Sequence, residues 1–234
     1  MEMIVEYFIG IVPPKEYLER IEQFQRRWVN HIGVEPHITL KAQGGLTPDK
    51  KWIEKVQNIC REFNPFHISL GKPKYFGDNI LYLTVHSKDL YELHQKIVQE
   101  ISPSENLIKQ YFELNDFIPH LTLGKRQYGG NISTGLSKNE LTQMEDLVDK
   151  ELAPYPVFEV DFIRIYELDT GKKRYEKYLD IPFNKWPRKS EVFSYALIFL
   201  FTPSNTYLHT FTFPFRTFTN PPFVLNKYSV KYEL

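Results

Sequence analysis

The segments EPHITLK (35–41) and IPHLTLG (118–124) carry nearly the same pattern, Pro-His-(Ile/Leu)-Thr-Leu, at two places in one chain. Side chains two positions apart in an extended strand point to the same face. We therefore expect the histidine and the threonine of each copy to share one face of a strand, while the isoleucine and leucine side chains anchor its other face in a core. Each copy would present one imidazole and one hydroxyl to a surface.

The four polar residues of these motifs are His37, Thr39, His120 and Thr122. The chain contains 7 histidines and 13 threonines, so a shuffled sequence of this composition is expected to hold roughly 0.4 His-x-Thr triplets. Two copies that also share the proline and the leucine therefore indicate a duplicated unit. A third segment, FHISL (66–70), offers a histidine and a serine at the same spacing.

The order of elements around the two motifs repeats as well, as strand, helix, motif strand, helix, strand. The first half is expected to contain a strand over 4–13, a helix opened by Pro13-Pro14, the first motif strand, a helix opened by Thr47 and Pro48, and a strand over 65–76. The second half is expected to contain a strand over 79–86, a helix capped by Ser87, a looser stretch over 102–117, the second motif strand, a helix with a capping box at Ser137 and Glu140, and a strand over 156–168. An extra strand over 174–183 should pair through a turn at 170–172.

Superposing the two halves separates the third triplet from the other two. His67 then corresponds to Glu159 and Ser69 to Asp161, so His67 has no symmetric partner. We expect His67 to be an exposed strand residue without a functional role.

Composition excludes several classes of function. Lys plus Arg and Asp plus Glu each number 29, so the net charge is zero, which disfavours a protein that holds long nucleic acid by its overall field. The single Cys60 cannot form an internal disulfide, and the N-terminal residues do not resemble a signal peptide. We therefore expect a cytoplasmic location.

The sequence lacks the glycine-rich phosphate loops of nucleoside triphosphatases and dinucleotide-binding proteins, and the His-Glu-x-x-His pattern of zinc proteases.

Two imidazoles and two hydroxyls around one groove suit a displacement at phosphorus. One imidazole can take a proton from the attacking hydroxyl or water, and the other can protonate the leaving oxygen. The threonine hydroxyls can donate hydrogen bonds to the non-bridging phosphate oxygens. This chemistry needs neither a metal nor another cofactor, and we expect none. Three alternatives remain open: a polar strand edge, a metal site at the two histidines, and a non-catalytic module that binds RNA ends or nucleotides.

The paired PHITL and PHLTL strands in a duplicated chain resemble the two-histidine (2H) phosphoesterase superfamily, most closely its bacterial 2′-5′ RNA ligase-like branch. The resemblance covers about residues 1–184. It implies an α+β, pseudo-two-fold, bilobal fold in which two mostly antiparallel sheets flank a central cleft and the helices lie outside. It also implies hydrolysis of 2′,3′-cyclic phosphates on RNA ends or small nucleotides, with 2′-5′ RNA ligation as a related reaction.

On these positions the resemblance makes His37 and His120 the acid and the base, and Thr39 and Thr122 the phosphate-binding residues. By analogy with related enzymes, His120 would activate water and His37 would protonate the leaving oxygen. Relatives often place an arginine shortly after the second motif. Lys125 and Arg126 stand there and are both candidates to bind phosphate.

Residues outside the motifs extend the predicted site. Phe76 and Tyr166 stand at roughly equivalent strand ends and are candidates to stack on a base, although a core position is the more ordinary role of an aromatic residue. Lys41, Lys72 and Lys74 are candidates to add positive charge near the site, although most lysines are simply solvated.

The predicted domain ends before a change of composition. Residues 1–184 form the duplicated domain, with halves at about 1–78 and 79–184, and residues 185–234 form an aromatic extension broken by prolines. The apolar run in this extension is too short to span a bilayer. We expect a monomer whose partners are RNA ends or small cyclic nucleotides, without a transmembrane segment.

Overall fold

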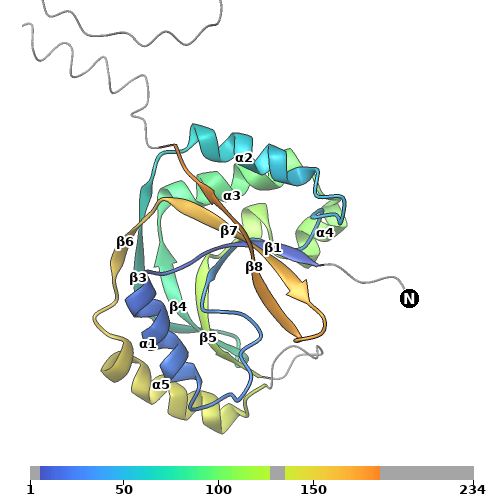
Figure 1. Cartoon of the computed structure of the whole chain (residues 1–234). Coiled ribbons are helices and arrows are strands. Elements are labelled where there is room, and N and C mark those ends of the chain that lie inside the picture. Colours follow the sequence, from blue (N-terminus) through green and yellow to red (C-terminus); the bar gives the residue numbers. More distant parts are fainter. Residues whose placement is uncertain (1–5, 127–134, 185–234) are drawn as a thin grey trace, which may run out of the picture. The chain divides into compact units, whose positions relative to one another are not determined.

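The computed structural model describes residues 6–126 and 135–184 (Figure 1), which all lie in one compact unit. The first half of this part contains β1 (Tyr7–Ile11), α1 (Lys15–Gln25), β2 (Ile38–Lys41), α2 (Trp52–Glu62) and β3 (Phe66–Phe76). The second half contains β4 (Ile80–His86), α3 (Lys88–Ile101), α4 (Glu105–Gln110), a 3-10 turn η1 (Leu114–Asp116), β5 (His120–Lys125), α5 (Lys138–Leu152), β6 (Val157–Val160), β7 (Phe162–Asp169) and β8 (Arg174–Pro182).

The eight strands form an antiparallel arrangement in the order β6-β3-β4-β5-β2-β1-β7-β8. The two motif strands, β5 and β2, lie at its centre and pair at a single position, Ile38 with Leu121. Four strands lie on each side of this junction, so the sheet has two halves that exchange places under a pseudo-two-fold rotation. The expected α+β class and the two antiparallel groups of strands are confirmed, and the single pair joins the two groups into one sheet.

The sheet is strongly curled, because β6 and β7 are consecutive in the chain yet stand first and seventh in the strand order. The sequence predicted one strand over 156–168. β6 ends at Val160 and β7 begins at Phe162, and there the chain passes from β3, the partner of β6, to β1, a partner of β7. The prediction of one strand was wrong because the two parts pair with opposite halves of the sheet.

The helices pack in two pairs on the outside of the curled sheet (Figure 1). α1 packs against α5, and both contact β5, whereas α2 packs against α3, which contacts β2. The first helix of each half therefore covers the motif strand of the other half. This exchange ties the two halves together around the central strands.

Several helix boundaries follow from local capping chemistry. Ser87 accepts a hydrogen bond from the Leu90 amide, and Ser137 and Glu140 form the expected capping box. The helix expected from Thr47 begins instead at Trp52, because Lys50 adopts a positive φ of 58° that a helix cannot contain. The stretch 102–117 was expected to be irregular, but it contains α4 and the 3-10 turn.

The described chain ends just after β8. The Asn184 amide donates to the carbonyls of Cys60 and Phe63, and Phe183 lies in the core. None of the helices in this part of the chain is long and apolar enough to cross a membrane. The predicted extension, 185–234, lies outside the described residues, and the division of the chain at residue 184 stays a prediction.

Candidate active site

The two motifs place their polar side chains on one face of the central strands. The residues between them, Ile38, Leu40, Leu121 and Leu123, are buried, while His37, Thr39, His120 and Thr122 are partly exposed. The pairing of Ile38 with Leu121 sets His37 across from Thr122 and His120 across from Thr39. The two histidines are therefore diagonal neighbours, a relation that separates Cβ atoms by about 7–8 Å in a regular antiparallel pair.

A proline turn fixes the orientation of each imidazole. His37 Nδ1 lies 2.8 Å from the carbonyl oxygen of Glu35, and His120 Nδ1 lies 2.8 Å from that of Ile118. Because a carbonyl only accepts, each Nδ1 carries the hydrogen, and each Nε2 keeps a lone pair. The proline between the two residues restricts φ and so holds the turn that makes this contact. The proline belongs to the repeated pattern for this reason.

Each imidazole packs against a stacked pair of aromatic rings. Phe8 and Tyr166 stack with centroids 4.4 Å apart, and their centroids lie 4.8 Å and 5.6 Å from that of His37. Phe76 and Tyr82 stack at 4.1 Å, and their centroids lie 4.9 Å and 5.4 Å from that of His120. The pseudo-two-fold relates Tyr166 on β7 to Phe76 on β3, whereas Tyr82 on β4 occupies the position of Gly10 on β1, so the second ring of each pair comes from a different position in the repeat. Both histidines thus lie in an apolar setting.

This setting lowers the pKa of both histidines. Burial lowers the pKa of His37 to about 4, and the positive charges of His120 and Lys125 act in the same direction. Burial also lowers the pKa of His120 from its usual value. Loss of hydration disfavours the charged form of an imidazole, so both rings are neutral at pH 7 when no ligand is bound.

A β-bulge follows the threonine of each motif and changes which later residues face the site. On β5, Tyr82 pairs with Thr122 and Leu81 with Gly124, so Leu123 is an extra residue. The bulge shifts the alternation, and Gly124 faces the core: a Cβ atom there would lie 2.7 Å from Met144 Sδ. Lys125 therefore joins the face of His120 and Thr122.

The equivalent bulge on β2 turns a lysine away from the site, whereas the bulge on β5 turns a lysine toward it. Gly10 pairs with Thr39 and Ile9 with Lys41, so Leu40 is the extra residue and Lys41 turns into the interior. Lys41 is fully buried, and its Nζ lies 2.8 Å from Glu113 Oε1. The expectation that Lys41 adds charge near the phosphate was wrong, because the bulge directs it to this buried ion pair.

An ionic network supports the turn before His37. Glu35 Oε1 accepts hydrogen bonds from Arg164 Nη1 at 2.7 Å and from the Tyr166 hydroxyl at 2.8 Å. Arg164 also donates two hydrogen bonds to Asp180. Two bonds in a fixed fork hold the guanidinium in one orientation. The side chain of Glu35 is thus anchored while its carbonyl orients His37. The corresponding residue before His120 is Ile118, whose side chain is exposed.

Two polar side chains complete the hydrogen bonding where the motif strands separate. β2 and β5 pair at one position only, so carbonyls beyond it lack a partner strand. Gln25 Nε2 from α1 donates to the carbonyls of Thr122 and Leu123, and His94 Nδ1 from α3 donates to that of Leu40 at 2.7 Å. The sequence reasoning missed both residues. The available signal was a polar residue at a buried position of the helix stripe, next to Phe24 and to Leu93.

A cavity of about 470 Å³ opens beside the first motif. Its lining includes His37, Thr39, Thr122 and Lys125, and it continues to Glu6, Gln43 and Tyr175. Within residues 6–126 and 135–184, neither Thr39 nor Thr122 uses its hydroxyl in a hydrogen bond to another side chain or to the backbone. Both hydroxyls are therefore available to a ligand. Arg126 is not among the described lining residues, although it follows Lys125 directly.

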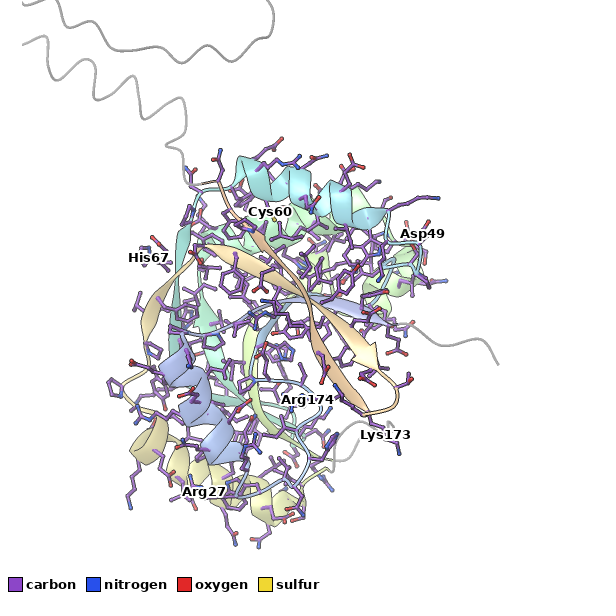
Figure 2. All side chains as sticks on the ribbon, in the orientation of Figure 1. Arg27, Asp49, Cys60, His67, Lys173 and Arg174 are labelled. Carbon is purple, nitrogen blue, oxygen red and sulfur yellow. The ribbon has the colours of Figure 1, made fainter. Side chains whose placement is uncertain are left out.

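The structure separates the predicted aromatic residues. Tyr166 is completely buried, with one face on Phe8 and its hydroxyl bound to Glu35, so it cannot stack on a base. That prediction was wrong because the ring is part of the wall behind His37. Phe76 is partly exposed beside His120 and stays a candidate for stacking. His67 is exposed at the outer side of the sheet, as Figure 2 shows, and its Cα partner across β6 is Glu159.

The described residues hold no group of three or more His, Cys, Asp or Glu side chains that could bind a metal ion. The two threonine hydroxyls and Lys125 instead offer hydrogen-bond donors and one positive charge on the same face as the two imidazoles, whose Nε2 atoms can accept a proton. Such a set fits an anion whose oxygens accept hydrogen bonds.

Known proteins resemble this chain in sequence and in fold. Residues 13–172 match the sequence model of the 2′-5′ RNA ligase superfamily. A protein of Oceanobacillus iheyensis is 25% identical over 154 residues, which cover 62% of this chain and 86% of that protein. A protein of Halalkalibacterium halodurans is 24% identical over 175 residues, which cover 71% of this chain and 92% of that protein. The names of both assign them provisionally as phosphoesterases.

A similar fold occurs in the crystal structure of TT0787 from Thermus thermophilus. The TM-score is 0.51 at 15% sequence identity, and the match covers 76% of this chain and 97% of that one. At this identity the likeness concerns the fold alone.

Proposed function

Because the chain belongs to the 2′-5′ RNA ligase superfamily, we propose that it is a metal-independent phosphodiesterase that opens ribose 2′,3′-cyclic phosphates. The observation that carries the proposal is the diagonal placement of two imidazoles, each with Nδ1 bound to a carbonyl and Nε2 free, beside two available threonine hydroxyls. Substrates would be RNA ends or small cyclic nucleotides, and the reverse type of reaction, 2′-5′ ligation, is a further activity to test.

The phosphate group would lie between the two imidazoles. Thr39, Thr122 and Lys125 would donate to its non-bridging oxygens, where negative charge increases in the transition state. One Nε2 would take a proton from water as the water oxygen attacks phosphorus. The other would protonate the ribose oxygen as its bond to phosphorus breaks. The proton taken from water and the proton given to the leaving oxygen balance over the cycle.

Electrostatics favour His37 as the base and His120 as the acid, opposite to the assignment made by analogy. A base must be neutral, and the pKa of His37 falls to about 4 through burial, with His120 and Lys125 acting in the same direction. Burial lowers the pKa of His120, and a bound phosphate anion beside the ring would raise it again. His120 is therefore the better candidate to hold a proton in the complex.

The direct test is turnover of nucleoside 2′,3′-cyclic phosphates by the protein and its single variants. We expect His37→Ala and His120→Ala each to lower kcat by about 10²–10⁴, the usual loss for a proton-transfer group. The double variant should lose much less than the product of the two, since the groups act together. His67→Ala is the matched control, because this histidine has the same x-Ser spacing but lies elsewhere on the sheet.

A substrate whose leaving group needs no proton distinguishes the two roles. It should restore turnover to His120→Ala and not to His37→Ala. The reverse pattern would make His120 the base and His37 the acid, as the analogy with related enzymes suggests. Turnover should persist in a chelator. Loss of activity in EDTA that a divalent ion restores would overturn metal independence. Binding of cyclic nucleotides without any turnover would support a non-catalytic nucleotide-binding module instead.

A further inference from the structure

The cavity beside His37 extends to a second polar group made of Glu6, Gln43 and Tyr175. The ring of Phe8 connects the two ends: its centroid lies 4.8 Å from that of His37 and 4.9 Å from that of Tyr175. The His37 and Tyr175 rings are thus no farther apart than about twice that distance. A ligand with its phosphate between the two histidines can therefore reach this second group with another part of the same molecule.

Hydrogen bonding within the second group leaves acceptors for a ligand. The Tyr175 hydroxyl donates to Glu6 Oε2 at 2.7 Å and accepts from Gln43 Nε2 at 3.2 Å. The proton of the hydroxyl and one amide hydrogen are thereby used, whereas Glu6 Oε1 and the amide oxygen of Gln43 have no bond to any described residue. No Lys, Arg or His of the described chain pairs with Glu6. The second group therefore offers a carboxylate oxygen without a cationic partner.

A cyclic nucleotide has few donors that could bind such a carboxylate. In a ribose 2′,3′-cyclic phosphate both secondary hydroxyls are part of the ester, so the remaining donors near the base are its own N–H groups. Guanine presents two adjacent donors, N1–H and the 2-amino group, which match the two oxygens of a carboxylate. Adenine and cytosine place a ring acceptor beside the amino group, and uracil flanks its single N–H with two carbonyls. A carboxylate repels these acceptors.

The rest of the cavity suits a flat base. Val29, Ile32 and Val34 also line it, and each is partly exposed. An apolar wall with a few placed polar groups is the usual construction of a ligand pocket. The wall supplies contact area for any base, and the polar group distinguishes among the bases.

We propose that Glu6 and Gln43 form a base-recognition subsite that selects guanine, so that guanosine 2′,3′-cyclic phosphate or an RNA end terminating in guanosine is the preferred substrate. Glu6 accepts the N1–H and 2-amino hydrogens, Tyr175 holds the carboxylate, and Gln43 holds the Tyr175 hydroxyl. The inference rests on the proposed function for the position of the phosphate. Base selectivity itself is a property of binding, so the affinities for different nucleotides can be measured without turnover.

Binding of the four nucleoside 2′-monophosphates, measured by isothermal titration calorimetry on the full chain, tests the subsite. The guanosine nucleotide should bind about 10- to 100-fold more tightly than the uridine nucleotide, the discrimination expected of a paired contact to a base. Glu6→Gln should reduce that ratio to near one and leave the affinity for uridine 2′-monophosphate unchanged. Gln43→Leu should reduce the ratio in the same direction, which keeps the test valid if Glu6→Gln unfolds the protein.

Glu176→Gln is the matched control. Glu176 follows Tyr175 on β8, is exposed, and pairs with Lys172, so its loss should leave the guanine preference intact. Equal affinities for all four nucleotides, or a guanine preference that survives in both Glu6→Gln and Gln43→Leu, would overturn the subsite.

Turnover of the four 2′,3′-cyclic nucleotides separates this inference from the proposed function. Hydrolysis at equal kcat/KM for all four would refute the subsite and support the phosphodiesterase. Guanine-selective binding without hydrolysis would support the subsite and refute the phosphodiesterase. Failure to bind any of the nucleotides would refute both.

Discussion

Replacing His94 with glutamine should remove a defined part of the pH dependence of folding. His94 is 2% exposed, its Nδ1 donates to the Leu40 carbonyl, and its Nε2 accepts from the Leu114 amide at 2.9 Å. The ring is therefore neutral in the folded protein, and burial lowers its pKa to about 4. In the unfolded chain a histidine titrates near about 6.5.

The size of the effect follows from these two pKa values. As the pH falls below about 6.5 the unfolded chain binds a proton at His94, while the folded protein does not until about pH 4. The lowered pKa thus contributes stability that is fully present above the unfolded value and is lost on acidification. At about 1.4 kcal/mol per pKa unit, going from pH 7.5 to pH 5 should cost about 2 kcal/mol through this residue.

Urea unfolding of the parent and of His94→Gln at pH 7.5 and pH 5 measures this contribution. Glutamine can replace only part of the hydrogen bonding, so the variant should also lose about 1–3 kcal/mol at pH 7.5. The diagnostic quantity is the change in the free energy of unfolding between pH 7.5 and pH 5. This change should shrink by about 2 kcal/mol in His94→Gln and stay the same as in the parent in His67→Gln, a substitution at an exposed histidine. An equal pH dependence in the parent and in His94→Gln would refute the reasoning.

Three further predictions concern the site and the domain boundary. Thr39→Val and Thr122→Val should each lower kcat/KM by about 10–10², less than loss of an imidazole, and leave both sides of the pH–rate profile in place. Glu35→Gln should move the acidic side of the kcat/KM profile to lower pH, because the carboxylate raises the pKa of His37, whereas Lys125→Met should move it to higher pH; shifts in the same direction would contradict this account. A chain ending at Asn184 should keep a cooperative thermal transition within a few degrees of the parent, since β8 and Phe183 are complete by then, and loss of that transition would place the extension in the core.

Much of the fold and the centre of the site could be predicted from the sequence. Alternation over 37–40 and 120–123 and the capping signals at Ser87 and Ser137 depend on neighbours close in the chain, and the structure agrees with them. The resemblance to the two-histidine phosphoesterases is confirmed at the level of the family. The paired motifs were sufficient for this because they repeat at several positions at once.

The remaining features depend on which strands meet in the folded chain. A bulge adds one residue to a strand relative to its partner strand. The amino-acid pattern within β2 and β5 does not reveal the register in which these strands pair with β1 and β4, so it does not predict the bulges. The sequence therefore could not tell that Lys41 turns inward and Lys125 outward. The break at Asp161 has the same origin, because the two parts of that segment pair with different strands. Burial of Tyr166 likewise follows from the curl of the sheet.

The duplicated motif alone would make the two histidines equivalent, and an acid and a base cannot be equivalent in one step. The surrounding residues remove that symmetry at matching positions. The turn before His37 begins with Glu35, bound to Arg164, whereas the turn before His120 begins with the exposed Ile118. After the bulges, Lys125 on β5 corresponds to Ala42 after β2, so only one of these two matching positions carries a positive charge. That lysine is among the charges that lower the pKa of His37. The backbone thus holds two imidazoles in the same tautomer, while the charged side chains around them differ between the two halves.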